Sequence, residues 1–486
     1  MSQLSSPPLP LSGGRSSRLG KRVAWGLLLL FVSAGGWSIY HYFINDKGLS
    51  AVVARIDQTD PGWRLRELEA ARPAVADREN AAAVVLAAQP LVPKGWLRPA
   101  VGQGPGLAEA IQQLAPVVQL NDSQVGELRA ALALAEPALA ESRRLAGMPR
   151  GRYGIVWSPD AIGTLLPHLE AVREIARLLS TDAVLQAQDG QMHAALTACK
   201  AAVNAGRSVG DEPCAISQLV RLASVEMGLR GMERALAQGT PSKSDLEELQ
   251  HLLEDEERQP LLLIAVRAWR AMMHQALEVM ASRRFNRRFY GIQNPHLVPD
   301  AAMNLVDSVI ARSSHAAYLR YLTEYVEIAK LPPEQVNARL PQLQKPKAEL
   351  PAFLAALTKG DHHKIGERFL KNLALLRCAS AGLAVERYRQ EQQHWPDKLA
   401  DLAPRFVAQV PSDPFDGAPL RFRRLDDGVV IYTLNEEGKD NGGNLLSAGN
   451  GSNSKAPAFR LWDVGSRRQP AAKPSSGAHV PQIDKR

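Results

Sequence analysis

The sequence predicts a mainly α-helical protein with one N-terminal transmembrane helix, an extracytoplasmic body of α-hairpins, and a small C-terminal α+β module with a short antiparallel sheet. Three observations lead to this prediction. Residues 23–44 are apolar, residues 45–360 are rich in Ala and Leu with Pro or Gly at helix-sized intervals, and the apolar spacing becomes irregular and then alternating after about residue 392. The chain has 486 residues, 45% hydrophobic and 22% charged, which excludes a largely disordered protein.

The basic charge of the chain is concentrated at its two ends. The net charge is +8, and residues 1–22 hold four basic groups and no acid, while residues 464–486 hold five basic groups and one acid. The excess therefore lies on two tails, the second expected to be disordered, and no specific nucleic-acid binding is predicted. Three scattered cysteines are too few for a disulfide scaffold or a closed zinc site.

Residues 23–44 are the predicted transmembrane helix. At about 1.5 Å per residue the stretch is long enough for a hydrocarbon core of about 30 Å, and Trp25 and Trp37 mark two interfacial belts. The basic residues 1–22 are expected to stay in the cytoplasm. A signal peptide cleaved after Ala34 is the alternative. We expect a single-pass protein of the cytoplasmic (inner) membrane, with its bulk in the periplasm.

The body, residues 45–360, is predicted to consist of helices joined by turns. Ser158-Pro159-Asp160 combines an N-cap, a first-turn proline and an acid, which predicts a helix from there to about Gln188. The pattern Ser244 to Glu247 is a capping box, and Pro137 should interrupt a helix over 123–145. Further helices are predicted over 64–72, 78–89, 192–207, 214–237, 260–282 and 301–330.

Small residues in the middle of the body loosely resemble a tetratricopeptide-type helix hairpin. Such hairpins form arrays of about three repeats or more, and one copy is visible here, so generic α-hairpins are the alternative. The residues that carry the resemblance are Ala183, Leu185, Asp189, Gly190, Ala194, Ala201 and Pro213.

Four arginines alternate with aromatic residues near position 285. Guanidinium groups beside aromatic rings are able to bind anionic lipid headgroups or cell-wall phosphates; a solvated loop is the alternative. The arginines are Arg283, Arg284, Arg287 and Arg288.

The acidic run Glu254–Glu257 is the main feature that an enzyme acting on envelope polymers could use. Consecutive acids spread around a helix instead of converging on a cleft, so we expect a solvated face. Motifs of hydrolases, nucleotide-binding proteins and dinucleotide-binding proteins are missing from the sequence. The sequence therefore does not predict an enzyme.

Residues 361–463 are predicted to form the C-terminal module. Its apolar residues follow a helical spacing up to about Gln392. Residues 420–424 and 429–434 then read as two strands, joined at Asp426-Asp427-Gly428 by a turn that suits a hairpin. A long helix packed on a small antiparallel sheet is expected.

The most specific sequence lies within residues 370–463. It contains Tyr388, Trp395-Pro396, Asp413-Pro414-Phe415 with Gly417 and Pro419, and Tyr432-Thr433-Leu434. At these residues the chain resembles the major pseudopilin of type II secretion, which implies the same helix-on-sheet fold. The pseudopilin leader has no counterpart at the start of this chain, so pilus-like polymerisation is not predicted. The whole layout resembles uncharacterised bacterial single-pass membrane proteins.

The resemblance also implies a calcium site in the acidic loop after the second strand. Its ligands would be Glu437, Asp440 and Asn441, with Asp463 closing the site. Calcium prefers six to eight oxygen ligands, which carboxylates, amides and carbonyls of such a loop are able to supply. A solvated acidic turn without a metal is the alternative.

The function expected from these features is that of a membrane-anchored extracytoplasmic scaffold, or protein-interaction protein, whose partners the sequence does not identify. An accessory component of a secretion or pilus-like assembly is the first alternative. An enzyme acting on envelope polymers is the second.

Overall fold

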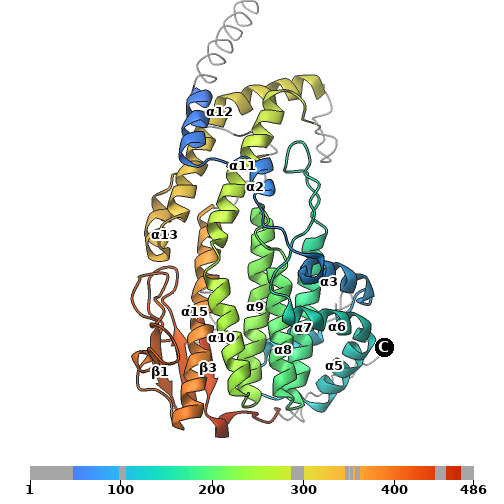
Figure 1. Ribbon diagram of the computed structural model, residues 1–486, viewed down its shortest axis with the longest axis vertical. Coiled ribbons are helices and arrows are strands. Elements are labelled where there is room, and N and C mark those ends of the chain that lie inside the picture. The colour runs from blue at the N-terminus through green and yellow to red at the C-terminus, as the bar shows by residue number, and fades with distance from the viewer. Residues whose placement is uncertain are drawn as a thin grey trace, which may run out of the picture.

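The protein is mainly helical and carries one three-stranded antiparallel sheet, as the sequence predicts. The long helices run along the long axis of the molecule, and the sheet packs against them near one end (Figure 1). The computed structural model describes residues 48–97, 106–285, 300–344, 350, 354–355, 362–443 and 456–471.

The first part of the described chain forms short helices. Asn121 begins one of them with a capping box, in which its side chain accepts from the Gln124 backbone N–H and the Gln124 side chain accepts in return. The predicted interruption near Pro137 is confirmed. The helices are residues 48–59, α2 (Leu65–Ala70), α3 (Ala81–Ala88), α4 (Leu107–Gln113), α5 (Asp122–Leu134) and α6 (Glu136–Ser142), followed by the 3-10 turn η3 (Arg143–Gly147).

Four consecutive helices form the centre of the molecule, and small residues allow them to approach closely. A Cβ atom on Gly228 would lie 2.6 Å from Cγ2 of Val203 in the preceding helix, so glycine is needed there. Two of these helices do not begin where predicted. The first begins at His168 instead of near Ser158, and the N-cap of the fourth is Ser242 instead of Ser244. The helices are α7 (His168–Gln188), α8 (Met192–Arg207), α9 (Ala215–Gln238) and α10 (Lys243–Glu257).

Three more long helices complete the helical part. Two of them agree with the predicted ranges 260–282 and 301–330, and they pack against each other around Tyr321, Leu322 and Leu277. The third ends at Gln392, as predicted. The helices are α11 (Leu261–Ala281), α12 (Asp300–Ala329) and α15 (His362–Gln392), with the short helix α13 (Pro333–Arg339) after α12.

The sheet has the order β1-β2-β3, and all its strands are antiparallel. β1 (Arg421–Leu425) and β2 (Gly428–Tyr432) form the predicted hairpin. β3 (Ala458–Trp462) was not predicted, although its buried Phe459 and Leu461 lie on either side of the partly exposed Arg460. The sheet packs on α15, where a Cβ on Gly382 would lie 2.5 Å from Cδ1 of Phe459.

One hydrophobic core joins the central helices to the C-terminal module. It contains Leu196, Leu229 and Leu253 from the central helices together with Leu383 and Phe459 from the module. The boundary expected at residue 360 therefore does not separate two cores.

The segment after the sheet also differs from the expectation of a disordered tail. Residues 464–471 cross the ends of α7 and α9, and Arg467 places its guanidinium 3.0 Å from the buried carboxylate of Glu386. The side chain of Arg468 donates to Ala187 and Gln188 carbonyls at the end of α7. Because both arginines find acceptors far away in the sequence, local composition alone does not reveal this docking. We call residues 463–471 the C-terminal strap.

The predicted membrane helix requires a correction. Within the described part of the chain, no helix is both long and apolar enough to cross a bilayer. Residues 1–22 and 23–44 lie outside the described residues. The assignment of a single-pass inner-membrane protein with its bulk in the periplasm is thus not supported.

Candidate protein-interaction surface

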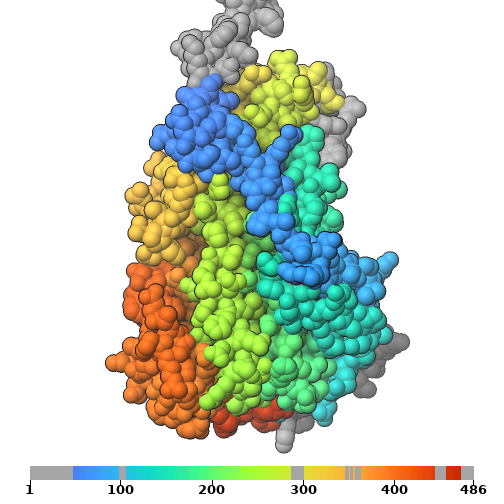
Figure 2. Space-filling model, in the orientation of Figure 1, coloured from blue at the N-terminus to red at the C-terminus, as the bar shows by residue number. Residues whose placement is uncertain are grey.

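Residues 149–167, between η3 and α7, form a loop that we call the projecting loop. It rises beside α2 and α11 (Figure 1) and lies at the surface, where it is coloured teal beside the blue α2 segment (Figure 2). The predicted helix start at Ser158 falls within it. At Pro159 and Asp160 the chain forms a turn, and the helix begins at His168, ten residues after Ser158.

The base of the loop is fixed against the turn between α8 and α9. A Cβ on Gly151 would lie 2.3 Å from the Ser208 carbonyl oxygen, so this contact requires glycine. The Arg150 carbonyl accepts from the backbone N–H of Ala81, and the Arg152 N–H donates to Asn80 Oδ1 at 2.9 Å. These contacts hold both sides of the first arm of the loop.

A buried polar cluster lies under the base. Tyr153 stacks on His168 with ring centroids 4.3 Å apart, and its hydroxyl lies 2.9 Å from Ser208 Oγ. Nε2 of His168 lies 3.0 Å from Glu212 Oε2, and Ser217 donates to the same carboxylate at 2.5 Å. Burial raises the pKa of Tyr153, which keeps the phenol neutral. The cluster joins both ends of the loop to α9.

The tip of the loop is fixed as well. Asp160 Oδ1 accepts from the Ser158 hydroxyl at 2.7 Å, and Thr164 Oγ1 accepts from the Ser158 backbone N–H at 3.0 Å, which joins the two arms. From α11, Gln275 donates to the Pro159 carbonyl at 2.8 Å. Ala161, at φ +62°, is buried among apolar side chains of α2 and α11. The tip therefore lies firmly on α11.

Between the fixed base and the fixed tip, two large aliphatic side chains point into solvent. Val156 is 93% exposed and Leu165 is 81% exposed, more than any other large hydrophobic residue in the described part of the chain. A flexible loop could bury such side chains by collapsing, but the contacts at the base and the tip hold this loop in place. Large apolar side chains that a fixed loop leaves exposed are candidates for a protein-interaction site.

The predicted calcium ligands do not all come together. Asp463 follows β3 beside the Gly428 end of β2 and accepts from Trp395 Nε1, whereas Asp440 follows the opposite end of β2. Glu437 pairs with Lys439, and Asn441 accepts from the Gly443 N–H. Among the described residues, no group of three or more His, Cys, Asp or Glu side chains is placed to hold a metal ion. The calcium site stays a prediction.

The predicted arginine cluster is described in part. Arg283 and Arg284 are exposed at the end of α11, whereas Arg287 and Arg288 lie outside the described residues. Contact with anionic lipid or cell-wall phosphate at these arginines stays a prediction.

The four acids of the run at the end of α10 contact four different side chains. The prediction that they form a solvated face is wrong for one of them. Glu256 is buried and forms a two-pronged pair with Arg221, which the run of acids alone did not reveal. The other acids contact different side chains, so the run does not converge on a cleft. Glu254 accepts from Gln250, Asp255 from Arg207 and Glu257 from Arg377.

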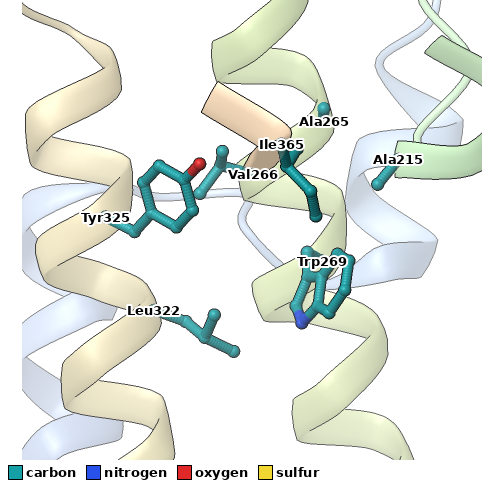
Figure 3. A pocket seen from close by; sticks show the side chains of 7 residues that line it. All are labelled: Ala215, Ala265, Val266, Trp269, Leu322, Tyr325 and Ile365. Atoms are coloured by element: carbon teal, nitrogen blue, oxygen red, sulfur yellow. The ribbon is translucent and has the colours of Figure 1, made fainter. Parts of the chain in front are cut away.

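Two hollows in the described structure are weaker candidates for a binding site than the projecting loop. The first is a small apolar pocket whose lining comes from α9, α11, α12 and α15 and carries no charged group (Figure 3). The second is a groove between α8 and α10, crossed by the pairs His193–Asp245 at 2.7 Å and Lys200–Glu248 at 2.8 Å. The charged side chains that line the groove are therefore already paired with one another.

Comparison of the chain with family models, with curated proteins and with solved structures gives no match. The resemblances to the pseudopilin and to tetratricopeptide hairpins thus stay predictions, and the geometry of the site is the basis for the functional proposal.

Proposed function

We propose that this protein is a binding scaffold and that its projecting loop docks onto an apolar groove of a partner protein. The observation that supports the proposal is the exposure of Val156 and Leu165 on a loop fixed at both ends. The consecutive packed helices α7 to α10 give such a loop a rigid support. We also propose that these helices are arranged as a helical repeat.

The energetics favour an aliphatic contact. Burial of one Val or Leu side chain contributes about 1.5–3 kcal/mol, and a contact site that is already ordered loses little conformational entropy on binding. The two exposed side chains are therefore suitable anchors within a larger contact surface.

The charges near the loop do not compete with this contact. Arg152 donates to the Arg72 carbonyl at 2.7 Å, Arg150 pairs with Glu79 at 2.7 Å, and Asp160 is used within the loop. Since these groups already have partners within the chain, we expect an apolar partner surface and a weak dependence of binding on salt.

Site-specific photo-crosslinking tests the proposal. A photoreactive residue placed at position 156 in cells should give one discrete adduct, and Leu165→Ser in the same chain should remove it. Position 134 is the matched control, because Leu134 is 73% exposed but lies on α5. Equal adducts from positions 156 and 134, or none from position 156, would contradict the proposal.

The captured protein is then purified and titrated against the full chain by calorimetry. Val156→Asp and Leu165→Asp should each weaken binding at least about tenfold, since a charge would enter an apolar contact, whereas Leu134→Asp should leave the affinity unchanged. Light scattering of the chain alone shows whether the loop instead pairs with a second copy, which would overturn the assignment of a different partner.

A further inference from the structure

The first arm of the projecting loop has the form of a β-strand. Residues 148–158 contain no helix, turn or bend, so their backbone is extended. Val156 is exposed, whereas Ile155 and Trp157 on either side of it are partly buried. The alternation continues at Gly154, which is exposed again. A period of two is that of a strand with one face on the protein and the other in solvent.

This strand has no partner for its backbone. Among the hydrogen bonds of the described residues, none involves a backbone N–H or C=O group of residues 154–157. The groups on either side are bonded. The Arg152 N–H donates to Asn80 Oδ1, and the Ser158 N–H donates to Thr164 Oγ1. Residues 154–157 are therefore held between two fixed points, with their own donors and acceptors available.

The composition of this stretch favours pairing with another strand. Ile155, Val156 and Trp157 are of the residue types that are enriched in strands, and residues 154–157 include neither a charge nor a proline. Natural proteins protect a free strand edge with such residues. The outer strand β1, for comparison, carries the exposed Arg423 and Arg424. The first arm therefore lacks the usual protection of a free edge.

We propose that an edge strand of the partner protein pairs with residues 154–157 by β-augmentation. The inference rests on the proposed function and deepens it, because it specifies what borders the apolar groove of the partner. Backbone hydrogen bonds fix the register, and the side chain opposite Val156 lies about 4.5–5.5 Å from it, in apolar contact. A helix is able to fill a groove, but its backbone groups are already paired within the helix.

The geometry of an extended chain makes the inference testable at single residues. The N–H and C=O groups of successive residues point to opposite edges of a strand. One partner strand therefore bonds either Gly154 and Val156 or Ile155 and Trp157, and leaves the other two amides without a new acceptor. A contact through side chains alone gives no such alternation.

Hydrogen exchange of the full chain, resolved to single residues, is the first measurement. In the chain alone, the amides of residues 154–157 should exchange faster than those of Arg152 and Ser158, which are hydrogen-bonded. The protein captured by crosslinking at position 156 is then purified and added to saturation. One alternate pair of the four amides should exchange at least about tenfold more slowly, and the other pair should change little.

Proline variants at neighbouring positions give the matched comparison. Val156→Pro and Ile155→Pro each remove one N–H and keep an aliphatic side chain, and neither N–H has an acceptor within the described part of the chain. The variant at the protected position should weaken binding at least about tenfold in calorimetry, and the other variant should weaken it less. Circular dichroism checks that both variants fold. If one does not, the exchange pattern of the wild type decides alone.

The outcomes separate this inference from the function on which it rests. Absence of an adduct at position 156 contradicts the proposed function, and the strand pairing with it. An adduct whose binding protects all four amides equally, or none of them, contradicts the strand pairing alone. Equal effects of the two proline variants, or protection of residues 154–157 in the chain without its partner, also contradict the strand pairing alone.

Discussion

At the scale of single residues, the most unusual contact is between two buried imidazoles. Nδ1 of His274 on α11 lies 2.8 Å from Nε2 of His315 on α12, and the Trp63 ring lies 4.7 Å from the first imidazole. Burial, with the neighbouring His315, lowers the pKa of His274 to about 3, and burial lowers the pKa of His315 to about 4. Both rings are therefore neutral at physiological pH.

This pair should make stability depend on pH. Below the ordinary histidine pKa of 6.5, the unfolded chain binds protons that the folded chain excludes, so the free energy of unfolding falls as pH drops from about 6.5 toward 4. The loss should be on the order of 3 kcal/mol for each of the two imidazoles. Urea unfolding at pH 7 and at pH 5 measures the part of this loss that falls between those two pH values.

The control for this prediction separates the pair from other titrating groups, which include Glu278 at 3.4 Å from His274 Nε2. His274→Leu/His315→Leu should unfold with a smaller difference between pH 7 and pH 5 than the wild type, whereas a variant of the exposed His251 should keep the wild-type difference. Identical differences in the wild type and the double variant would exclude the pair as the cause.

The calcium ligands show how far single residues could be predicted. Glu437, Asp440 and Asn441 do lie in one loop, because they are close in sequence. Asp463 lies at the other end of β2, and the pairing of β2 with β3 that separates it from the loop is a tertiary feature that local sequence does not reveal.

At the scale of elements, helices were predicted best where the apolar spacing and the residues at the helix ends indicate the same bounds. The ends of α11, α12 and α15 lie within two residues or so of the predicted ones. Ser158-Pro159-Asp160 has the local chemistry of a helix start, but the tip contacts with α11 and the buried Ala161 hold it as a turn. A tertiary contact therefore decided against the local preference.

The C-terminal strap gives the prediction at this scale. The Arg468 guanidinium caps α7 through the Gln188 carbonyl at 2.8 Å and α9 through the Gln238 carbonyl at 3.2 Å. Arg468→Ala should lower the free energy of unfolding by about 2 kcal/mol, because it leaves the ends of two helices without a cationic cap.

Hydrogen exchange locates this effect. Arg468→Ala should speed amide exchange in the last turns of α7 and α9 and leave α12 unchanged. Arg405→Ala is the control, since Arg405 is an exposed arginine that pairs with Glu391 at the surface. Equal effects of the two variants would mean that the strap arginine acts as an ordinary surface charge.

At the scale of the whole molecule, the helical class and the hairpin were predicted, whereas the core shared by the predicted body and the predicted C-terminal module was not. Hydrophobic periodicity identifies the buried face of each helix, but it does not say which helix covers that face. Here α10 packs on α15, and Gln250 donates to the Phe406 carbonyl at 2.8 Å. The membrane helix was predicted from the length of an apolar stretch and its flanking aromatic and basic residues, and it is not supported by the described residues.

The shared core leads to a prediction for fragments. Residues 362–471 expressed alone should be unfolded or aggregated, because the apolar face that α15 turns to α9 and α10 would be exposed. Circular dichroism and tryptophan fluorescence of the full chain should report one coincident urea transition. A fragment that melts cooperatively at the full-chain temperature would show two independent units.

The strap has a consequence for biosynthesis. Arg468 meets the carbonyl of Ala187 across 281 positions of sequence, and it leaves the ribosome after all the described helices. Until residue 468 has been synthesised, only water is able to cap these ends of α7 and α9. Slow completion of the fold is expected when a contact joins residues so far apart in the sequence.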